Sequence, residues 1–471
     1  MNRILFISDK IWPDDNSGIP IITYKQALYQ KKMQYEIAFL NVSNNNEIGK
    51  NNEIGKIYFL PVHNQNFVSI KSIIRNLITK KHIVNKLNKI LDDFNPDIIH
   101  INSYFSINPM IFKEFNPAED KTFRIIDDDG KVINKAYLPE LDNATLIKAY
   151  QSMLFARVAD QMAVSYQRQG RMYTYPPILG QEALQIAAGM IIREEDWLVP
   201  AFREMGVMLA KGVSLKEIFL YYLGNEEGSN FSNANHVLPI CVPIGSQLLH
   251  ATGIAYAVKY QKKDEVVFPF IGDGGTSEGD FSEALNFAAV WQVPVVFTIQ
   301  NNQYAISVPV KNQTKSVNLA VKAVGFGMPG IKVDGNDFFA MYVAYKEALE
   351  HARAGKGPVL IEAYTYRKGA HTTSDDPSKY RTKAEEKSWE KADPLSRLKK
   401  YMDSQGIVLE NEEELIQSYK DEVDKQFLEA ENFRPYDLED VFNYMYVEMP
   451  DDLKRQKANY EQYLSWKEKR K

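Results

Sequence analysis

Two short apolar runs on either side of a segment with helical spacing constrain the fold of this chain most strongly. The runs EVVFPFIG, residues 265–272, and PVVFTIQ, residues 294–300, have the length and composition of buried strands. Between them, apolar residues recur at i, i+3, i+4, i+7 and i+8, from Phe281 to Ala289, which is the spacing of an amphipathic helix. A strand, a helix and a strand in this order predict a βαβ unit with parallel strands.

Polar residues follow both predicted strands at the point where each ends. Asp273, in GDG, follows the first strand, and Asn302, in QNNQYAIS, follows the second. Carboxyl ends of parallel strands open on one edge of a sheet, where open α/β folds bind ligands. Carboxylate, amide and backbone oxygens suit Mg²⁺ or Ca²⁺, and so few protein ligands leave positions open for phosphate oxygens. Glycines around Asp273 would let a diphosphate approach closely.

The spacing of these motifs carries more information than either motif alone. A lone GDG is most often a turn. Here GDG is followed after 26 residues by NN, across the predicted βαβ unit. This pattern matches the fingerprint of proteins that bind thiamine diphosphate with Mg²⁺.

Composition is typical of a globular protein and excludes several classes. The 471 residues are 45% hydrophobic with a net charge of -5, which predicts two to four domains and gives no reason to expect binding to nucleic acid or a membrane. Cys241, the only cysteine, excludes an internal disulfide and a cysteine-rich zinc site. The first residues lack the apolar core of a signal peptide, and no run approaches a membrane span. We therefore expect a soluble cytoplasmic protein.

Residues 1–113 differ in amino-acid composition from the rest of the chain. Asn, Lys and Ile are abundant, and the strand-like RILFIS, YEIAFLNV, KIYFLPV and PDIIHINS are joined in part by a helical pattern over residues 69–94. This predicts a small Rossmann-like α/β segment. ILFISDKIWPDDNSG and PDIIHIN resemble the N-terminal half of two-domain glycosyltransferases. The second, nucleotide-sugar domain of that family is not found downstream, so we expect a partial domain without its own catalysis.

The rest of the chain is expected to fall into three parts. Residues 114–141 are polar with turn signals and predict an extended arm. Residues 142–385 alternate helices and buried strands, beginning with a long helix from Asp142 to Gln169 that is capped by Asp142 or Asn143. Residues 386–471 are charged and predict a helical region with solvated faces.

From about residue 120 the chain resembles the alpha subunits of the decarboxylating component of 2-oxo acid dehydrogenase complexes, most closely the bacterial pyruvate dehydrogenase type. The resemblance covers about three quarters of the chain. It implies a thiamine-diphosphate-binding fold, a parallel sheet flanked by helices, and oxidative decarboxylation of pyruvate with transfer of the acetyl group to lipoyl groups. The matching motifs are YQRQGRMYTYPPILGQEA, WLVPAFREMG, VLPICVPIGSQLLHATGIAYAVK and GPVLIEAYTYRKGAHTTSDDPSKYR.

The resemblance also assigns a role to several residues around the diphosphate. Asp273, Asn302 and the backbone oxygen of Tyr304 would be Mg²⁺ ligands. The backbone amides of Gly274 and Gly275 would contact the diphosphate. A second motif, AFRE, adds Arg203 as a phosphate partner. In the same motif, Phe202 stands where the family usually has a tyrosine, so its contact through a hydroxyl is lost.

Apolar residues are implied around the aminopyrimidine of the cofactor. Val242 and Ile244 would line it, with Ile244 as the wedge that bends the cofactor. Tyr175 and Gln181 would border the same cavity. For the apolar members of this set, packing in the core is an equally good interpretation.

His371, in GAHTTSDDPSKYR, is the catalytic candidate. A histidine in a polar loop after a strand can donate to an oxygen of the substrate and move a proton near pH 7. Some members of the family place a second histidine in an earlier loop. Here that loop carries Glu226 and Glu227, so a mechanism with two histidines is not expected.

The chain should provide only part of an active site. In the family, a beta subunit completes the site in an α2β2 heterotetramer, and a lipoyl acyltransferase receives the acyl group. No beta-type domain is found in this sequence. Pyruvate, branched-chain 2-oxo acids and acetoin remain alternative substrates, and a non-catalytic fusion with the glycosyltransferase-like fragment remains an alternative function.

Overall fold

The computed structural model describes residues 3–8, 36–43, 56–61, 98–101, 110–409 and 411–470. Contacts divide the chain into two compact units, Met1–Glu114 and Phe115–Lys471. Within these described residues, no helix is long and apolar enough to cross a membrane.

The first unit contains a four-stranded sheet in which every pair of neighbours is parallel. The strand order is β3-β2-β1-β4, so the chain crosses from one edge of the sheet to the other after β3. The helix predicted over residues 69–94 lies outside the described residues. The bounds are β1 Arg3–Ser8, β2 Glu36–Ser43, β3 Lys56–Pro61, β4 Ile98–Ile101 and α4 Met110–Glu114.

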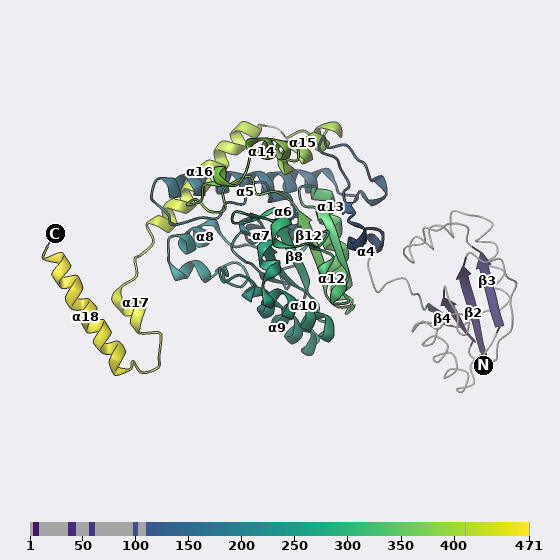
Figure 1. The fold of residues 1–471 in the computed structure, drawn as a ribbon, viewed down its shortest axis with the longest axis horizontal. Coiled ribbons are helices and arrows are strands. Elements are labelled where there is room, and N and C mark those ends of the chain that lie inside the picture. Colours follow the sequence, from purple (N-terminus) through teal and green to yellow (C-terminus); the bar gives the residue numbers. More distant parts are fainter. Residues whose placement is uncertain are drawn as a thin grey trace. The chain divides into compact units, whose positions relative to one another are not determined.

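The second unit is built on a six-stranded sheet in the order β5-β11-β12-β8-β7-β6 (Figure 1). All neighbouring strands are parallel, which confirms the predicted parallel sheet flanked by helices. The strands are β5 Thr122–Phe123, β6 Trp197–Val199, β7 Val267–Gly272, β8 Val296–Asn301, β11 Gly330–Asp334 and β12 Val359–Tyr364.

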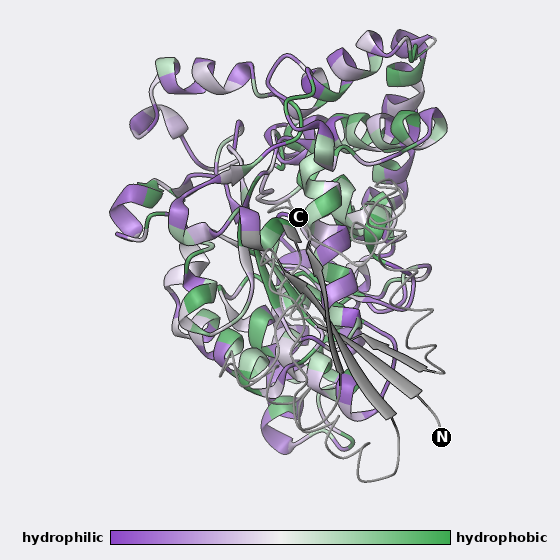
Figure 2. Ribbon diagram, turned by 90° about the vertical axis from the view of Figure 1, so that its right-hand side faces the viewer, coloured by the Kyte–Doolittle hydropathy of each residue, from purple (hydrophilic) through white to green (hydrophobic). Residues whose placement is uncertain are grey.

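Helices cover both faces of this sheet because its central strands are apolar on both sides. Every residue of β8 is buried. Helices α9, Ser246–Tyr260, and α10, Gly279–Trp291, pack on β7 and β8 through one apolar cluster that includes Leu248, Phe281 and Leu285. Helices α6, Glu182–Ile191, and α13, Phe338–Arg353, lie on the other side. In Figure 2, hydrophobic residues gather toward the middle of this unit and hydrophilic residues on its outer helices.

Several helix ends follow from local chemistry. The carboxylate of Asp142 accepts a hydrogen bond from the backbone N–H of Thr145 at 2.7 Å and starts α5, Asn143–Arg168. Later in the chain, α14, Lys383–Glu390, and α15, Pro394–Ser404, are separate helices. Pro394 occupies the first turn of α15, where its missing N–H costs nothing, and Asp393 caps that helix.

The remaining elements are short helices and a small hairpin, followed by the C-terminal helices. No residue of α18 is buried. The bounds are α7 Met205–Ala210, α8 Leu215–Tyr222, β9 Tyr304–Ala305, β10 Val308–Pro309, α11 Val310–Gln313, α12 Lys322–Gly325, α16 Glu412–Glu431, α17 Leu438–Phe442 and α18 Asp451–Glu468, with single 3-10 turns at 117–119, 135–137, 226–229, 274–277 and 377–379.

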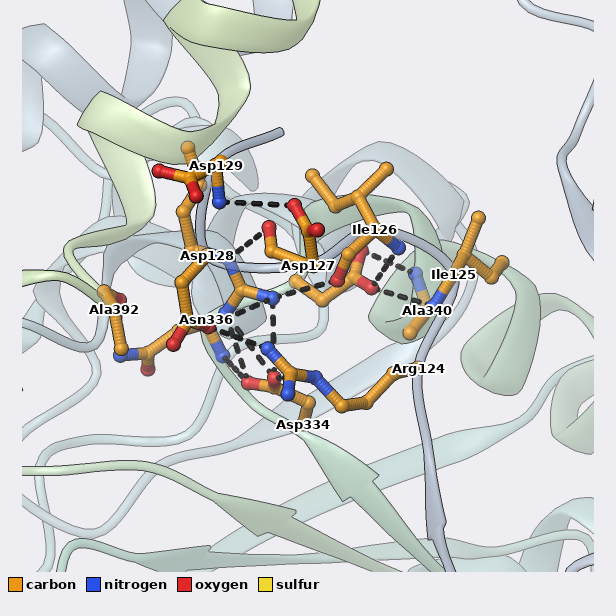
Figure 3. Close-up of polar contacts among 12 residues, drawn as sticks. Arg124, Ile125, Ile126, Asp127, Asp128, Asp129, Asp334, Asn336, Ala340 and Ala392 are labelled. Atoms are coloured by element: carbon orange, nitrogen blue, oxygen red, sulfur yellow. Dashed lines mark hydrogen bonds and ion pairs between the residues drawn. The ribbon is translucent and has the colours of Figure 1, made fainter. Parts of the chain in front are cut away.

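The segment that precedes α5 is fastened to the sheet by buried charges (Figure 3). The backbone N–H groups of Ile125 and Ile126 donate to one carboxylate oxygen of Asp337 at 2.7 and 2.8 Å. The guanidinium of Arg397, which is fully buried, donates to the carbonyl of Ile126 and to Asp334. We call residues 122–137, which lie within the predicted extended arm of residues 114–141, the arm. The arm adds a strand to the sheet and is joined to the unit by buried hydrogen bonds and by ion pairs.

Candidate active site

Four neighbouring strands, β12, β8, β7 and β6, point their carboxyl ends at one cavity of about 290 Å³. Parallel strands share the direction of their ends, so residues far apart in sequence meet here. Phe202 and Arg203 follow β6, and Asp273 follows β7. Asn302 follows β8, and His371 lies in the loop after β12. All five line the cavity.

Asp273 is a nearly fully buried carboxylate, 1% exposed, at the end of β7. One of its oxygens accepts a hydrogen bond from the side-chain amide of Gln313 at 2.8 Å. Burial raises the pKa of Asp273, and the hydrogen bond from Gln313 acts in the opposite direction. A buried carboxylate is stabilised by a nearby cation, so this group can hold a metal ion.

Two further oxygens at this end of the cavity are suited to a hard cation. The side-chain oxygen of Asn302 is buried and has no hydrogen-bond partner within the described part of the chain. The carbonyl of Tyr304 accepts one hydrogen bond, from Arg367 at 2.9 Å, and retains a second lone pair. An unpaired buried acceptor is costly, and a cation would satisfy it. Residues 110–409 and 411–470 contain no cluster of three His, Cys, Asp or Glu side chains that could hold a metal. The oxygen donors at this end of the cavity are therefore one carboxylate, one amide and one carbonyl.

The glycines around Asp273 differ in what they leave open. A Cβ on Gly272 would meet nothing within 4 Å, whereas a Cβ on Gly274 would lie 2.5 Å from the Cβ of Ala305. A Cβ on Gly275 would lie 2.4 Å from the side chain of Ile271. Gly274 and Gly275 are therefore required by packing against protein, and they bring backbone to the cavity wall.

Two arginines give the cavity a positive wall. Arg203 donates to the carbonyl of Pro177 at 2.5 Å and to the carbonyl of His371 at 2.8 Å. Burial and the neighbouring charge of Arg367 lower the pKa of Arg203 to about 10, so it stays charged at neutral pH. Its guanidinium also lies over the ring of Phe202, 5.5 Å from the centroid. Two buried cations beside a ligand-sized cavity favour a polyanionic ligand such as a diphosphate.

His371 is held in a neutral form by its surroundings. Burial and the charges of Arg203 and Arg367 lower the pKa of His371 to about 4. Its Nδ1 lies 3.2 Å from a guanidinium nitrogen of Arg203, so Nδ1 accepts and the ring hydrogen is on Nε2. The sequence predicted a histidine that donates to a substrate oxygen and moves a proton near pH 7. A neutral imidazole with its hydrogen on Nε2 is suited to the first of these roles.

Not every predicted residue lies at the cavity. Ile244 lines it. Val242 is 56% exposed and lies outside the lining. Tyr175 is buried outside the lining, and its hydroxyl donates to the buried carboxylate of Asp160 at 2.8 Å. Gln181 is buried, and its side-chain amide has no hydrogen-bond partner among the described residues. The turn that carries Glu226 also lies outside the lining.

Three lining or bracing residues were missed by sequence reasoning. Arg367 donates to the carbonyls of Tyr304 and Ile306 and lies next to His371. Glu204 lines the cavity, and burial raises its pKa to about 7. Gln313 contacts Asp273 from outside the motif. Charged residues three to five positions after the end of a buried strand were an available signal for Arg367 and Glu204. Nothing in the sequence distinguishes Gln313.

Comparison with known proteins agrees with this geometry. The family model described as the dehydrogenase E1 component matches residues 150–438. Proteins named pyruvate dehydrogenase E1 component subunit alpha are similar over nearly their whole length. The protein of Acholeplasma laidlawii is 47% identical over 341 residues, which are 72% of this chain and 99% of that protein. The protein of Mycoplasma pneumoniae is 41% identical over 74% of this chain and 98% of its own, and that of Staphylococcus aureus is 40% identical over 76% and 96%.

Proposed function

Since the chain belongs to the dehydrogenase E1 component family and matches pyruvate dehydrogenase alpha subunits over nearly their whole length, we propose that it is the alpha subunit of a pyruvate dehydrogenase. The reaction is the oxidative decarboxylation of pyruvate, with transfer of the acetyl group to a lipoyl group. The observation that carries the proposal is the meeting of Asp273, Asn302 and Arg203 at one cavity.

The family implies thiamine diphosphate as cofactor, and the residues present fit it. When bound, thiamine diphosphate supplies the carbon nucleophile and the electron sink needed to remove carbon dioxide from a 2-oxo acid. Arg203 and the backbone amides of Gly274 and Gly275 would hold the diphosphate. Ile244, which lines the cavity, would border the aminopyrimidine. The apolar ring of Phe202 orients Arg203 without itself donating to a phosphate.

We assign the divalent cation to Mg²⁺, bound by Asp273, Asn302 and the carbonyl of Tyr304. The oxygen of Asn302 supports this assignment, because it has no hydrogen-bond partner among the residues that the structure describes. Three protein oxygens leave coordination positions for phosphate and water, as Mg²⁺ usually requires.

His371 would act on the substrate side of the cavity. Its Nε2–H can donate a hydrogen bond to an oxygen that gains negative charge during the reaction, and a donor placed before the reaction is effective in a dry site. Arg203 fixes the ring so that this hydrogen does not turn away.

An alpha subunit requires a beta subunit as partner. We propose an α2β2 heterotetramer that passes its acyl group to a lipoyl acyltransferase component. A single cysteine fits a reducing compartment, and we place the complex in the cytoplasm.

The test is reconstitution of the full chain with the beta subunit of the same organism. With thiamine diphosphate and Mg²⁺, we expect decarboxylation of pyruvate in preference to branched-chain 2-oxo acids and acetoin, and no activity from the chain alone. Asp273→Asn should weaken thiamine diphosphate binding by about 100-fold, since a charge-assisted metal contact is worth about 3 kcal/mol. Glu283→Gln, an exposed change on α10, is the control. Robust decarboxylation without a beta subunit would refute the proposal, and so would tight binding by the Asp273 variant.

A further inference from the structure

Gln313 is tied to the candidate metal site by both hydrogens of its side-chain amide. Its Nε2 donates to one carboxylate oxygen of Asp273 at 2.8 Å and to the carbonyl of Val308 at 2.9 Å. Both partners are acceptors only, so the nitrogen must face them and the amide cannot be turned over. Gln313 is the last residue of α11 and is only partly exposed.

Gln313 donates a hydrogen bond to one carboxylate oxygen of Asp273 and none to the other oxygen. Because one oxygen is held by an N–H at hydrogen-bond distance, the group is restrained from turning both oxygens toward the cavity.

Gln313 also fixes the hairpin that carries a second candidate ligand. Strands β9 and β10 pair Tyr304 with Pro309 and Ala305 with Val308. On one side of this hairpin, Arg367 donates to the carbonyls of Tyr304 and Ile306. On the other side, Gln313 joins the carbonyl of Val308 to Asp273 at the end of β7. Gln313 thus links the end of β7 to the hairpin of β9 and β10, and this link sets the separation between the carboxylate and the Tyr304 carbonyl.

We propose that Gln313 is a positioning residue that makes Asp273 a ligand through one oxygen and thereby selects Mg²⁺ over Ca²⁺. This inference rests on the proposed function of the site. Mg²⁺ is small and demands a nearly ideal octahedron, whereas Ca²⁺ accepts both oxygens of a carboxylate in a larger, more flexible shell. A carboxylate that offers one oxygen suits the octahedron of Mg²⁺ and prevents Ca²⁺ from binding both oxygens.

The experiment measures the dissociation constants of Mg²⁺ and Ca²⁺ directly. The full chain in complex with its beta subunit is titrated with each metal alone at saturating thiamine diphosphate, and binding is followed by calorimetry. Gln313→Ala and Gln313→Met both remove the donor, and Met also preserves the length of the side chain. Asn312→Ala, at the exposed neighbour on the same helix, is the control.

In both Gln313 variants we expect the Mg²⁺ constant to rise at least about tenfold, the loss expected for about 1.4 kcal/mol, while the Ca²⁺ constant stays within about threefold. A residue with only a structural role would weaken both metals equally, so an unchanged ratio of the two constants overturns the proposal. If the parent complex binds neither metal in the presence of thiamine diphosphate, the proposed metal site itself fails and this inference fails with it.

Discussion

At the scale of single residues, the surroundings of His371 set its charge. Burial and the charges of Arg203 and Arg367 lower the pKa of His371 to about 4, so the ring of the folded protein is neutral from about pH 5 upward. The motif predicted a side chain that donates to a substrate oxygen and moves a proton near pH 7, and the first of these roles suits a neutral ring. Because the pKa of His371 is lower than that of an ordinary histidine, the ring takes up a proton only as the pH falls toward 4. Between pH 5 and 8 the ring therefore stays neutral and keeps its single N–H donor.

The neutral form of His371 predicts how substitutions behave. Glutamine carries a donor at a similar distance from the backbone and cannot become an acid, whereas alanine carries neither. We expect His371→Ala to lower kcat by about 100-fold and His371→Gln to retain at least about tenfold more activity than the alanine variant. The measurement is kcat of the reconstituted complex from pH 5.5 to 8. Equal loss in the two variants would show that proton transfer, rather than hydrogen bonding, is the role of His371.

At the scale of elements, the site follows from strand direction and from buried polar ties between elements. The ends of β6, β7, β8 and β12 converge because all four strands are parallel. The arm is an example of buried polar contacts between elements. Asp337 caps α13 by accepting from the N–H of Ala340 and, with its other oxygen, accepts from Ile125 and Ile126. One carboxylate therefore joins the arm to a helix that covers the sheet.

Replacing Asp337 with asparagine tests the hydrogen bonds that join the arm to α13. The amide would place a donor against one of three buried N–H groups, and an unsatisfied buried donor costs about 2 kcal/mol. We expect Asp337→Asn to lower the free energy of unfolding by about that amount and to speed hydrogen exchange at Ile125 and Ile126. Asp129→Asn, at an exposed position of the same arm, should change the free energy by less than about 0.5 kcal/mol. Similar values for the two variants would contradict the role of Asp337.

At the scale of the whole molecule, the cavity belongs to the second of the two units. Every described residue that lines it is in Phe115–Lys471. The beginning of that unit is packed within it, since the ring of Phe115 lies 4.9 Å from that of Phe123 and 6.2 Å from that of Tyr137. The alpha subunits to which the chain is similar match 72% to 76% of its length. The resemblance of residues 1–113 to a glycosyltransferase half stays a prediction.

A chain that begins at Phe115 should keep the properties of the site. We expect it to assemble with the beta subunit and to bind thiamine diphosphate with the affinity of the full chain within about twofold, a difference of about 0.4 kcal/mol. Size-exclusion chromatography and calorimetry of the two complexes measure this. A loss of affinity above about tenfold would show that residues 1–114 contribute to the site.

The sequence by itself determined the fold class and the strand ends that line the cavity. Apolar runs and helical spacing are local patterns, and they placed Asp273 and Asn302 at neighbouring strand ends. The motif order also gave the family and its cofactor. Tertiary structure alone decided the protonation of His371, the position of Tyr175 away from the cavity, and the partner of Asp273. These properties depend on burial and on charges contributed by distant segments. Gln313 is 40 residues from Asp273 along the chain, and only folding brings its amide to the carboxylate.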